Sequence, residues 1–179
     1  MLTYQLIRQF PTLKTLGLAV KYFPGYINRK VALHGVDVVL VSFILRGRGK
    51  HIIGNETYPE SGGSLAVTHY GQKHDIITDR RGMDVINLYL NLKNHPLPSL
   101  PVELQAALPL LLPLHRNFQH RLNRIVRLQM DDPQPLADLL FAIRRELDAR
   151  ERGYREVVPM LFKYFLTLCC RQVVKTGLV

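Results

Sequence analysis

The segment Met83–Leu92 carries two polar side chains suited to contacting a ligand. In an extended strand, side chains alternate between two faces. Asn87 and Tyr89 therefore share one face, and three aliphatic residues share the other: Ile86, Leu88 and Leu90. Polar tips on an apolar wall give a pocket its orientation and specificity. If the Asn87/Tyr89 face lines the interior, these residues contact a ligand. If the aliphatic face does, the interior is a filled core, and both arrangements stay open.

Histidines and arginines before this strand are further candidates for binding. The histidines are His34, His51, His69 and His74. His74 ends a Gly-x-x-His element and could hydrogen-bond a ligand inside a cavity, or only the local backbone at a rim. Arg46 and Arg48 flank Gly47 and could attract an anion, or simply belong to a solvated turn.

The motifs of common enzyme classes are not recognisable in the chain. Ser42, Ser61, Ser64 and Ser99 lie outside any nucleophile-elbow pattern. The glycines at 47 and 49 lack the rest of a phosphate-binding or dinucleotide-binding loop. We therefore predict no catalytic residue and no enzymatic activity.

Short strands separated by glycine-bearing turns must position these side chains. Val36–Arg46 is almost wholly apolar and rich in β-branched residues, which predicts a strand buried on both faces. Further strands are expected at Lys50–Ile53, Glu56–Tyr58, Leu65–Thr68, Asp75–Thr78 and Met83–Leu92. The turns between them are expected at 47–49, 54–55, 61–63 and 79–82. Such regular spacing predicts an all-β sandwich or barrel.

The periodicity changes from two to 3.6 after a proline-rich stretch, so we expect about three α-helices at the C-terminal end. Their apolar stripes fall in Leu114–Gln129, Leu136–Asp148 and Tyr154–Val174. The expected organisation has four parts. Residues 1–33 form a basic arm with a strand at Leu18–Phe23, 34–92 form the barrel, 93–113 form a proline-rich linker, and 114–174 form a helical packing and dimerisation region.

Several short motifs, taken in order, resemble the cupin-type sensor domain of AraC-family transcription regulators. They are the glycines 47 and 49 after Leu45, the Gly54-Asn55 hairpin, Tyr58-Pro59, Gly63, and Gly71 with His74. The helical stretch Ile143–Leu147, a break at Gly153-Tyr154 and the apolar residues 157–168 also fit. The resemblance spans about residues 34–174. It implies a mainly β fold, a cupin-like β-barrel (double-stranded β-helix or jelly roll), followed by the helices.

Catalytic cupins resemble the same barrel but hold a metal with two histidines, a carboxylate and a later histidine. His34 and His74 match the first and last of these ligands, whereas Val36 and Leu40 stand at the other two positions. Ser64 stands where the family usually has an acid. Two histidines are too few for a firm first-row metal site, so we expect neither a metal nor another cofactor.

The charge suggests nucleic acid at first sight, because 24 Lys and Arg against 14 Asp and Glu give a net charge of +10. However, residues 37–100 are nearly neutral, with seven bases and six acids, and the excess lies at the two ends. A basic stripe is expected on the first helix: Arg116, His120, Arg124 and Arg127. We interpret it as solvated or paired with acids. The paired helix-turn-helix motifs of AraC-type regulators are not found here, so DNA is expected to be read by a domain absent from this chain.

A reducing, cytoplasmic setting is expected. The two cysteines, Cys169 and Cys170, are adjacent and suggest apolar filler in a helix rather than a disulfide framework. The longest apolar run is too short to span a bilayer, and the start lacks a continuous apolar signal region. We expect no membrane partner.

The resemblance implies a domain that binds a small metabolite, a sugar being one candidate, and controls an attached DNA-binding domain within a homodimer. We expect ligand contacts from His34, Arg46, His74, Asn87 and Tyr89. A homodimer interface is expected on the last helix: Tyr154, Leu161, Phe162, Tyr164, Phe165 and Leu168. The alternatives are a standalone cupin enzyme, such as an isomerase or dioxygenase, and a protein-interaction module with an occluded barrel.

Overall fold

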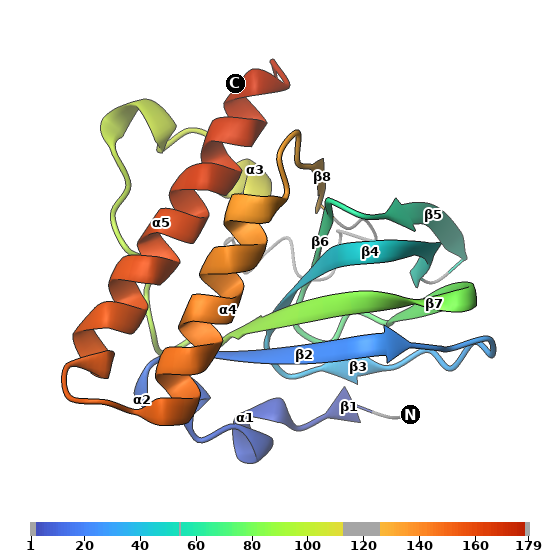
Figure 1. Cartoon of the computed structure of the whole chain (residues 1–179), viewed down its shortest axis with the longest axis horizontal. Helices are drawn as coiled ribbons and strands as arrows, with labels where there is room; N and C mark the ends of the chain where they lie inside the picture. Colours follow the sequence, from blue (N-terminus) through green and yellow to red (C-terminus); the bar gives the residue numbers. More distant parts are fainter. Residues whose placement is uncertain (1–2, 54, 113–125, 178–179) are drawn as a thin grey trace.

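A computed structural model describes residues 3–53, 55–112 and 126–177 (Figure 1). Its main sheet has the strand order β2-β7-β4-β6-β8, with β5 paired to β4. The strands are β2 (Leu18–Tyr26), β4 (Val39–Ile53), β5 (Glu56–Ser61), β6 (Ser64–Thr68), β7 (His74–Leu90) and β8 (Val126–Gln129). Helices α4 (Gln134–Ala149) and α5 (Tyr154–Lys175) follow and lie side by side at one end of the sheet (Figure 1). The expected class, mainly β with C-terminal helices, is confirmed.

The sheet stays open within the described residues. Its hydrogen-bonded path runs from β2 to β8 and does not return to β2 there. A second, small sheet joins β1 (Thr3–Tyr4) in parallel to β3 (Gly35–Val36). The strands therefore form a sandwich-like arrangement, and the barrel expected from the sequence is not closed by this ladder.

One face of the sheet is the filled core. In the antiparallel β4–β7 ladder, Val41 pairs with Leu88 and Phe43 with Ile86. These side chains are at most 3% exposed and form one cluster with residues of α4 and α5, including Ile143. The aliphatic face of Met83–Leu92 thus packs against the helices. Of the two faces of this strand, it is the one that belongs to the filled core.

The N-terminal segment covers the opposite face. It contains β1 and two short helices, α1 (Leu6–Gln9) and α2 (Thr12–Thr15). Leu6 and Leu13 are buried in a cluster with Tyr89. The side-chain amide of Asn91 donates to the Leu13 carbonyl at 3.0 Å, and Asp37 Oδ1 accepts from the Leu6 amide at 2.7 Å. These bonds tie the segment to the sheet.

The strand expected in the basic arm is present as β2, but it belongs to the main sheet. It pairs with β7 from Leu18 opposite Leu90 to Tyr26 opposite Met83. The sheet therefore begins before the boundary expected at residue 34. The expected linker is also built into the fold, because its 3₁₀ turn η1 (Val102–Leu104) and helix α3 (Leu108–Leu111) bury Leu104 and Leu111 in the core.

Two expected turns lie inside continuous strands. β4 runs through residues 47–49 and β7 runs through 79–82. Gly47 pairs with Met83 and Gly49 with Thr78, so the ladder skips residues 79–82. Gly47 has φ +95°, and a Cβ there would lie 2.4 Å from the Gly82 carbonyl oxygen. Gly47 and Gly49 therefore mark a bulge at which two backbones approach closely, and the chain does not reverse there.

The expected helix Leu114–Gln129 is wrong at its end, where Val126–Gln129 forms β8 against β6. The local reason is visible in the sequence, because apolar and polar residues alternate there with period two and Leu128 is buried in the core. Arg127 of the expected basic stripe thus lies on a strand and contacts the Pro59 carbonyl and Glu60. Arg116, His120 and Arg124 lie outside the described residues.

The other two expected helices are confirmed as α4 and α5, and α5 turns Phe162 and Phe165 into the core. Phe162 and Phe165 are 6% and 1% exposed and contact the chain's own core, whereas Leu161 and Leu168 are only partly buried. Two expected dimer contacts, Phe162 and Phe165, are therefore used inside the domain. By length and composition α5 could cross a membrane, but its residues Phe162, Phe165 and Cys169 pack in the core of the domain.

The adjacent thiols of α5 are part of the same core. Cys169 and Cys170 are free and fully buried. Burial raises the pKa of the Cys170 thiol to about 11, so it stays protonated at neutral pH. The expectation of apolar filler in a helix is confirmed for this pair.

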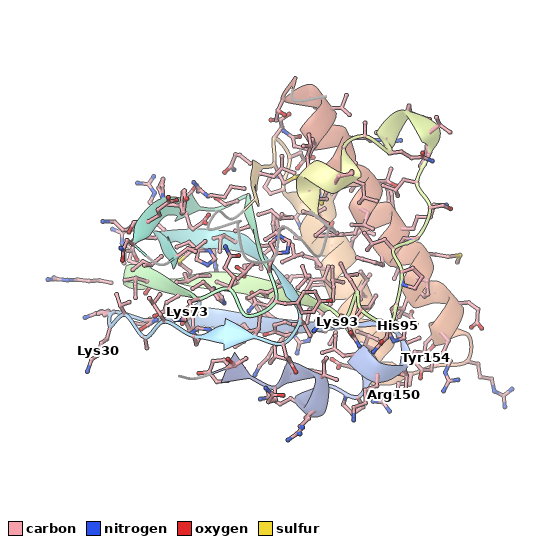
Figure 2. The ribbon with its side chains drawn as sticks, turned by 180° about the vertical axis from the view of Figure 1, so that it is seen from behind. Lys30, Lys73, Lys93, His95, Arg150 and Tyr154 are labelled. Carbon is pink, nitrogen blue, oxygen red and sulfur yellow. The ribbon has the colours of Figure 1, made fainter. Side chains whose placement is uncertain are left out.

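Basic side chains lie at separate places on the surface. Figure 2 shows Lys30 and Lys73 toward one end of the sheet, and Lys93 and Arg150 nearer the helices. Other bases are paired, as in the contact between Lys175 and Asp131 at 3.4 Å.

The bulge at Gly47 generates a first prediction. Gly47→Ala should destabilise the domain by about 2–4 kcal/mol, because it adds a backbone clash to the cost of a left-handed φ. Gly71→Ala is the matched control, since Gly71 has φ +68° and nothing lies within 4 Å of its Cβ position. That variant should lose only about 1–2 kcal/mol. Urea denaturation measures both, and equal losses would contradict the close approach.

Candidate functional site

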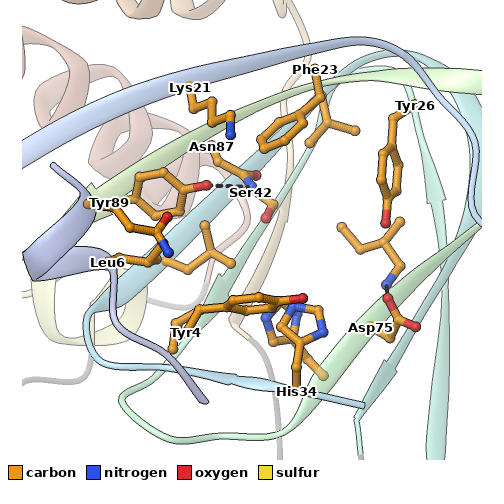
Figure 3. A pocket seen from close by; sticks show the side chains of 16 residues that line it. Tyr4, Leu6, Lys21, Phe23, Tyr26, His34, Ser42, Asp75, Asn87 and Tyr89 are labelled. Atoms are coloured by element: carbon orange, nitrogen blue, oxygen red, sulfur yellow. Dashed lines mark hydrogen bonds between the residues drawn. The ribbon is translucent and has the colours of Figure 1, made fainter. Parts of the chain in front are cut away.

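A cavity of about 340 Å³ lies between the N-terminal segment and the face of the sheet opposite the helices (Figure 3). Its volume is at the lower end of the range of small-molecule sites. Seven of the residues that line it are predominantly apolar: Leu6, Phe23, Tyr26, Val36, Leu40, Ile76 and Val85. The remaining lining residues are polar: Tyr4, Gln9, Lys21, His34, Ser42, His74, Asp75, Asn87 and Tyr89.

Four of the five residues expected to contact a ligand line this cavity. They are His34, His74, Asn87 and Tyr89. The fifth, Arg46, is not in the lining: its side chain is 80% exposed, and its guanidinium pairs with Asp84 at 2.5 Å. Asp84 in turn accepts from the Gly25 amide at 2.7 Å. Arg46 therefore supports the bend near Gly25 instead of facing the cavity.

Asn87 and Tyr89 come together with Ser42, which the sequence reasoning missed. In the β4–β7 ladder Ser42 pairs with Asn87 and Leu40 with Tyr89, so all four point to the cavity side. The Asn87 amide donates to the Tyr89 hydroxyl at 3.4 Å. Ser42 alternates with Leu40 in an apolar strand, and pairing that strand with Met83–Leu92 in the correct register would have revealed it.

Three buried polar atoms of the lining have no hydrogen-bond partner among the described residues. They are Asn87 Oδ1, Ser42 Oγ and His74 Nε2, and we call them the open polar atoms. A buried polar group without a partner costs roughly 1–3 kcal/mol. Most such groups in native proteins are paired. Their gathering on one cavity therefore points to a partner that enters it, either water or a ligand.

His74 is a deeply buried polar group of the lining, at 3% exposure. Its ring lies 4.7 Å from the ring of His34, and the ring of Tyr4 meets His34 edge-on at 4.9 Å. Burial lowers the pKa of His74 well below its ordinary value, and His51 and His34 lower it further. His74 is therefore neutral at pH 7 and can accept or donate according to its tautomer.

The cavity reaches the surface beside the N-terminal segment. Gln9 and Lys21 are exposed and Tyr4 is 40% exposed. Lys21 Nζ lies 4.9 Å from the centre of the Phe23 ring, and Figure 3 shows Lys21 above Asn87. The segment carrying Tyr4 thus forms one side of the opening.

Asp75 is used to hold the chain around the cavity. Its carboxylate accepts from the Asn28 side-chain amide at 3.0 Å and from the Ala32 amide at 2.7 Å. Both partners precede β3, so the carboxylate positions the stretch that brings His34 to the lining. Asp75 therefore acts as a positioning residue.

The donor set offers little for a metal. The described residues contain no group of three or more His, Cys, Asp or Glu side chains placed to hold an ion. Val36 and Leu40, which stand at two ligand positions of catalytic cupins, are apolar walls of the cavity.

Comparison with known proteins decides the family. The sequence model of the AraC-like ligand binding domain matches residues 19–155, which include β2 after its first residue, the whole β4–β7 ladder and α4. The chain belongs to the AraC-like ligand-binding domain family. No curated protein sequence matches this AraC-like domain.

Solved structures similar to this AraC-like domain include ToxT and cupin proteins. An apo variant of ToxT from Vibrio cholerae is 14% identical, with a TM-score of 0.47 over 83% of this chain and 54% of that one. ToxT bound to an unsaturated fatty acid is 12% identical, with a TM-score of 0.47 over 87% of this chain and 55% of that one. A cupin 2 conserved barrel domain protein from Rhodopseudomonas palustris is 19% identical, with a TM-score of 0.36 over 54% of this chain and 64% of that one. This chain thus spans about half the length of ToxT.

Burial of neutral His74 generates a prediction about pH. In the unfolded chain a histidine binds a proton below about pH 6.5, whereas folded His74 does not until a much lower pH. The unfolded state therefore binds more protons, and stability should fall as pH drops below about 6.5, by up to about 1.4 kcal/mol per pH unit. Urea denaturation between pH 7.5 and 5 measures this slope.

The control for this prediction is His74→Gln, which keeps a polar side chain but removes the titrating ring. Burial also lowers the pKa of His69, so the variant should retain part of the slope. An unchanged slope in His74→Gln would contradict the assignment to His74.

Proposed function

We propose that this AraC-like domain binds a small, hydroxylated metabolite in the cavity and thereby controls an attached DNA-binding domain. The observation that carries the proposal is the set of open polar atoms, Asn87 Oδ1, Ser42 Oγ and His74 Nε2, on the lining of one cavity. A molecule with several hydroxyl groups could satisfy all three at once. A sugar is one candidate, and the small volume favours a compact molecule over a long chain.

The N-terminal segment gives ligand binding a way to alter the domain's surface. Leu6 and Tyr4 form part of the lining, and both belong to the N-terminal segment, which packs on the sheet through Leu6 and Leu13. A ligand that touches them favours the docked arrangement by its difference in affinity for the docked and undocked states. We propose that this difference changes how the attached domain meets DNA in the cytoplasm.

A regulatory role is favoured over an enzymatic one by the family to which the domain belongs. The cupin-enzyme alternative would need a tightly held metal, and two of the positions compared with metal ligands are Val36 and Leu40. One metal ion per chain, retained through purification, would contradict a purely regulatory role.

We also propose a homodimer through α5. Met160 and Tyr164 are 64% and 51% exposed on this helix, and Leu161 and Leu168 are partly buried beside them. Apolar side chains on consecutive turns of an exposed helix face form the kind of strip that a second helix covers. Tyr154 lies at the start of the same helix.

Ligand binding is tested by thermal shift with a panel of monosaccharides and polyols. A compound that binds the native state should raise Tm in proportion to its occupancy. Asn87→Ala should then reduce the affinity about tenfold, because it removes one hydrogen bond in a buried site. Asn94→Ala, an exposed residue outside the cavity, is the matched control and should bind as the wild type does. Silence of the whole panel would favour an occluded interaction module.

The dimer is tested by light scattering after size-exclusion chromatography. Tyr164→Lys should shift the mass from two chains to one at micromolar concentration, because it places a charge in the apolar strip. Thr57→Lys adds the same charge to an exposed position of β5 and should remain dimeric. A wild-type mass of one chain would refute the homodimer.

A further inference from the structure

A row of buried polar side chains crosses three neighbouring strands, starting at the cavity. His74 of β7 lies opposite Ile53 of β4, and Gly49 of β4 lies opposite Glu60 of β5. His51 of β4 stands between them, diagonal to both on the same face. The exposed fractions of His74, His51 and Glu60 are 3%, 0% and 4%. Only the first of them lines the cavity.

Each side chain of this row lies close to the next, through one hydrogen bond and two ionic contacts. His74 Nδ1 lies 2.9 Å from His51 Nε2. The other ring nitrogen of His51, Nδ1, lies 3.7 Å from Glu60 Oε1. The second carboxylate oxygen of Glu60 lies 3.3 Å from Arg127 Nη2. Arg127 comes from β8 at the edge of the sheet, so the row ends in a paired carboxylate.

The carboxylate fixes the protons along the row. A neutral imidazole has one N–H and one lone pair. His51 must turn its N–H toward Glu60, because a lone pair on Nδ1 would face a buried carboxylate oxygen. His51 Nε2 is then an acceptor, and the proton of the 2.9 Å bond comes from His74 Nδ1. His74 Nε2 then keeps its lone pair. A hydrogen-bond partner on the other ring nitrogen fixes the tautomer of metal-bound histidines in the same way.

This lone pair belongs to the cavity. Nδ1 of His74 is occupied by His51, which is not part of the cavity lining, so the Nε2 edge of the ring faces the other way. Nε2 has no partner within the described part of the chain. Asn87 Oδ1, also without a described partner, is an acceptor as well. The cavity thus holds two acceptors, of which the lone pair of His74 is fixed by the row.

We propose that Glu60 and His51 are positioning residues that hold His74 with its lone pair on Nε2, so that the cavity selects a ligand that donates an O–H or N–H group there. A molecule that can only accept would face two lone pairs and leave them unsatisfied. The ligand class is therefore a hydroxyl or amine donor. This selectivity rests on the proposed function, whereas the tautomer of His74 does not.

The tautomer is tested without any ligand. Long-range ¹H–¹⁵N correlation spectra of the labelled protein at pH 7.5 distinguish a protonated from an unprotonated ring nitrogen. His74 should show the proton on Nδ1, and His51 should show it on Nδ1 as well. In Glu60→Gln, the proton on His51 is no longer fixed and both rings should give mixed signals. A proton on His74 Nε2 in the wild type would overturn the proposal, whether or not the variant folds.

The selectivity is tested with cyclohexanol and cyclohexanone, which have similar size but differ in donating a hydrogen bond. Titration at millimolar concentration, followed by shifts of Asn87 and His74 resonances, should give about tenfold tighter binding of cyclohexanol. Glu60→Gln should reduce this preference, and Thr57→Gln, on the same strand but exposed, should keep it. Equal binding, or preference for the ketone, would overturn the selectivity.

The tautomer of His74 and the selectivity for a donor can fail separately. If neither probe shifts the cavity resonances, the selectivity fails, the panel of monosaccharides and polyols still decides the proposed function, and the spectra still decide the tautomer. If cyclohexanol is preferred but His74 carries its proton on Nε2, binding stands and the role assigned to Glu60 and His51 is wrong.

Discussion

The long antiparallel pairing of β4 with β7 is the interaction on which the rest of the molecule depends. It extends from Val39 opposite Leu90 to Ile53 opposite His74. Because side chains alternate across a strand, one ladder sends Phe43 and Ile86 into the core beneath the helices and Ser42 and Asn87 into the cavity. A slip of one residue would exchange these faces. It would bury Asn87 under α4 and turn Ile86 into the cavity, so the core itself enforces the register that builds the site.

Much of the molecule follows from local patterns in the sequence. Alternation predicted most strands, helical periodicity predicted α4 and α5, and the Asn87/Tyr89 pair fell on one face of its strand. Which face was the cavity could not be derived, since both are covered: one by the helices, the other by the N-terminal segment. That segment contributes Tyr4 and Leu6, and no local pattern marks short pieces that become walls only through contacts such as Asn91 with Leu13.

The errors have physical causes of the same kind. Glycines at 47 and 49 suit a turn, but their freedom is used where a loop of β7 passes against β4. α5 carries apolar residues around most of its surface, so composition allowed several buried stripes, and packing on the sheet selected the one with Phe162 and Phe165. The end of the expected first helix became β8 because the open edge of β6 offered backbone partners for Leu128 and its neighbours.

The two halves of β4 have different tasks. Residues 39–44 lie between β6 and β7 and fix the core, while residues 49–53 lie between β5 and β7 and carry His51. The bulge at 47–49 separates them. Buried polar groups are tolerated in the second half because each contact of the row supplies charge or hydrogen-bond complementarity to the next. The lone pair on His74 Nε2 lies at the cavity end of the row, where an entering molecule can complete it.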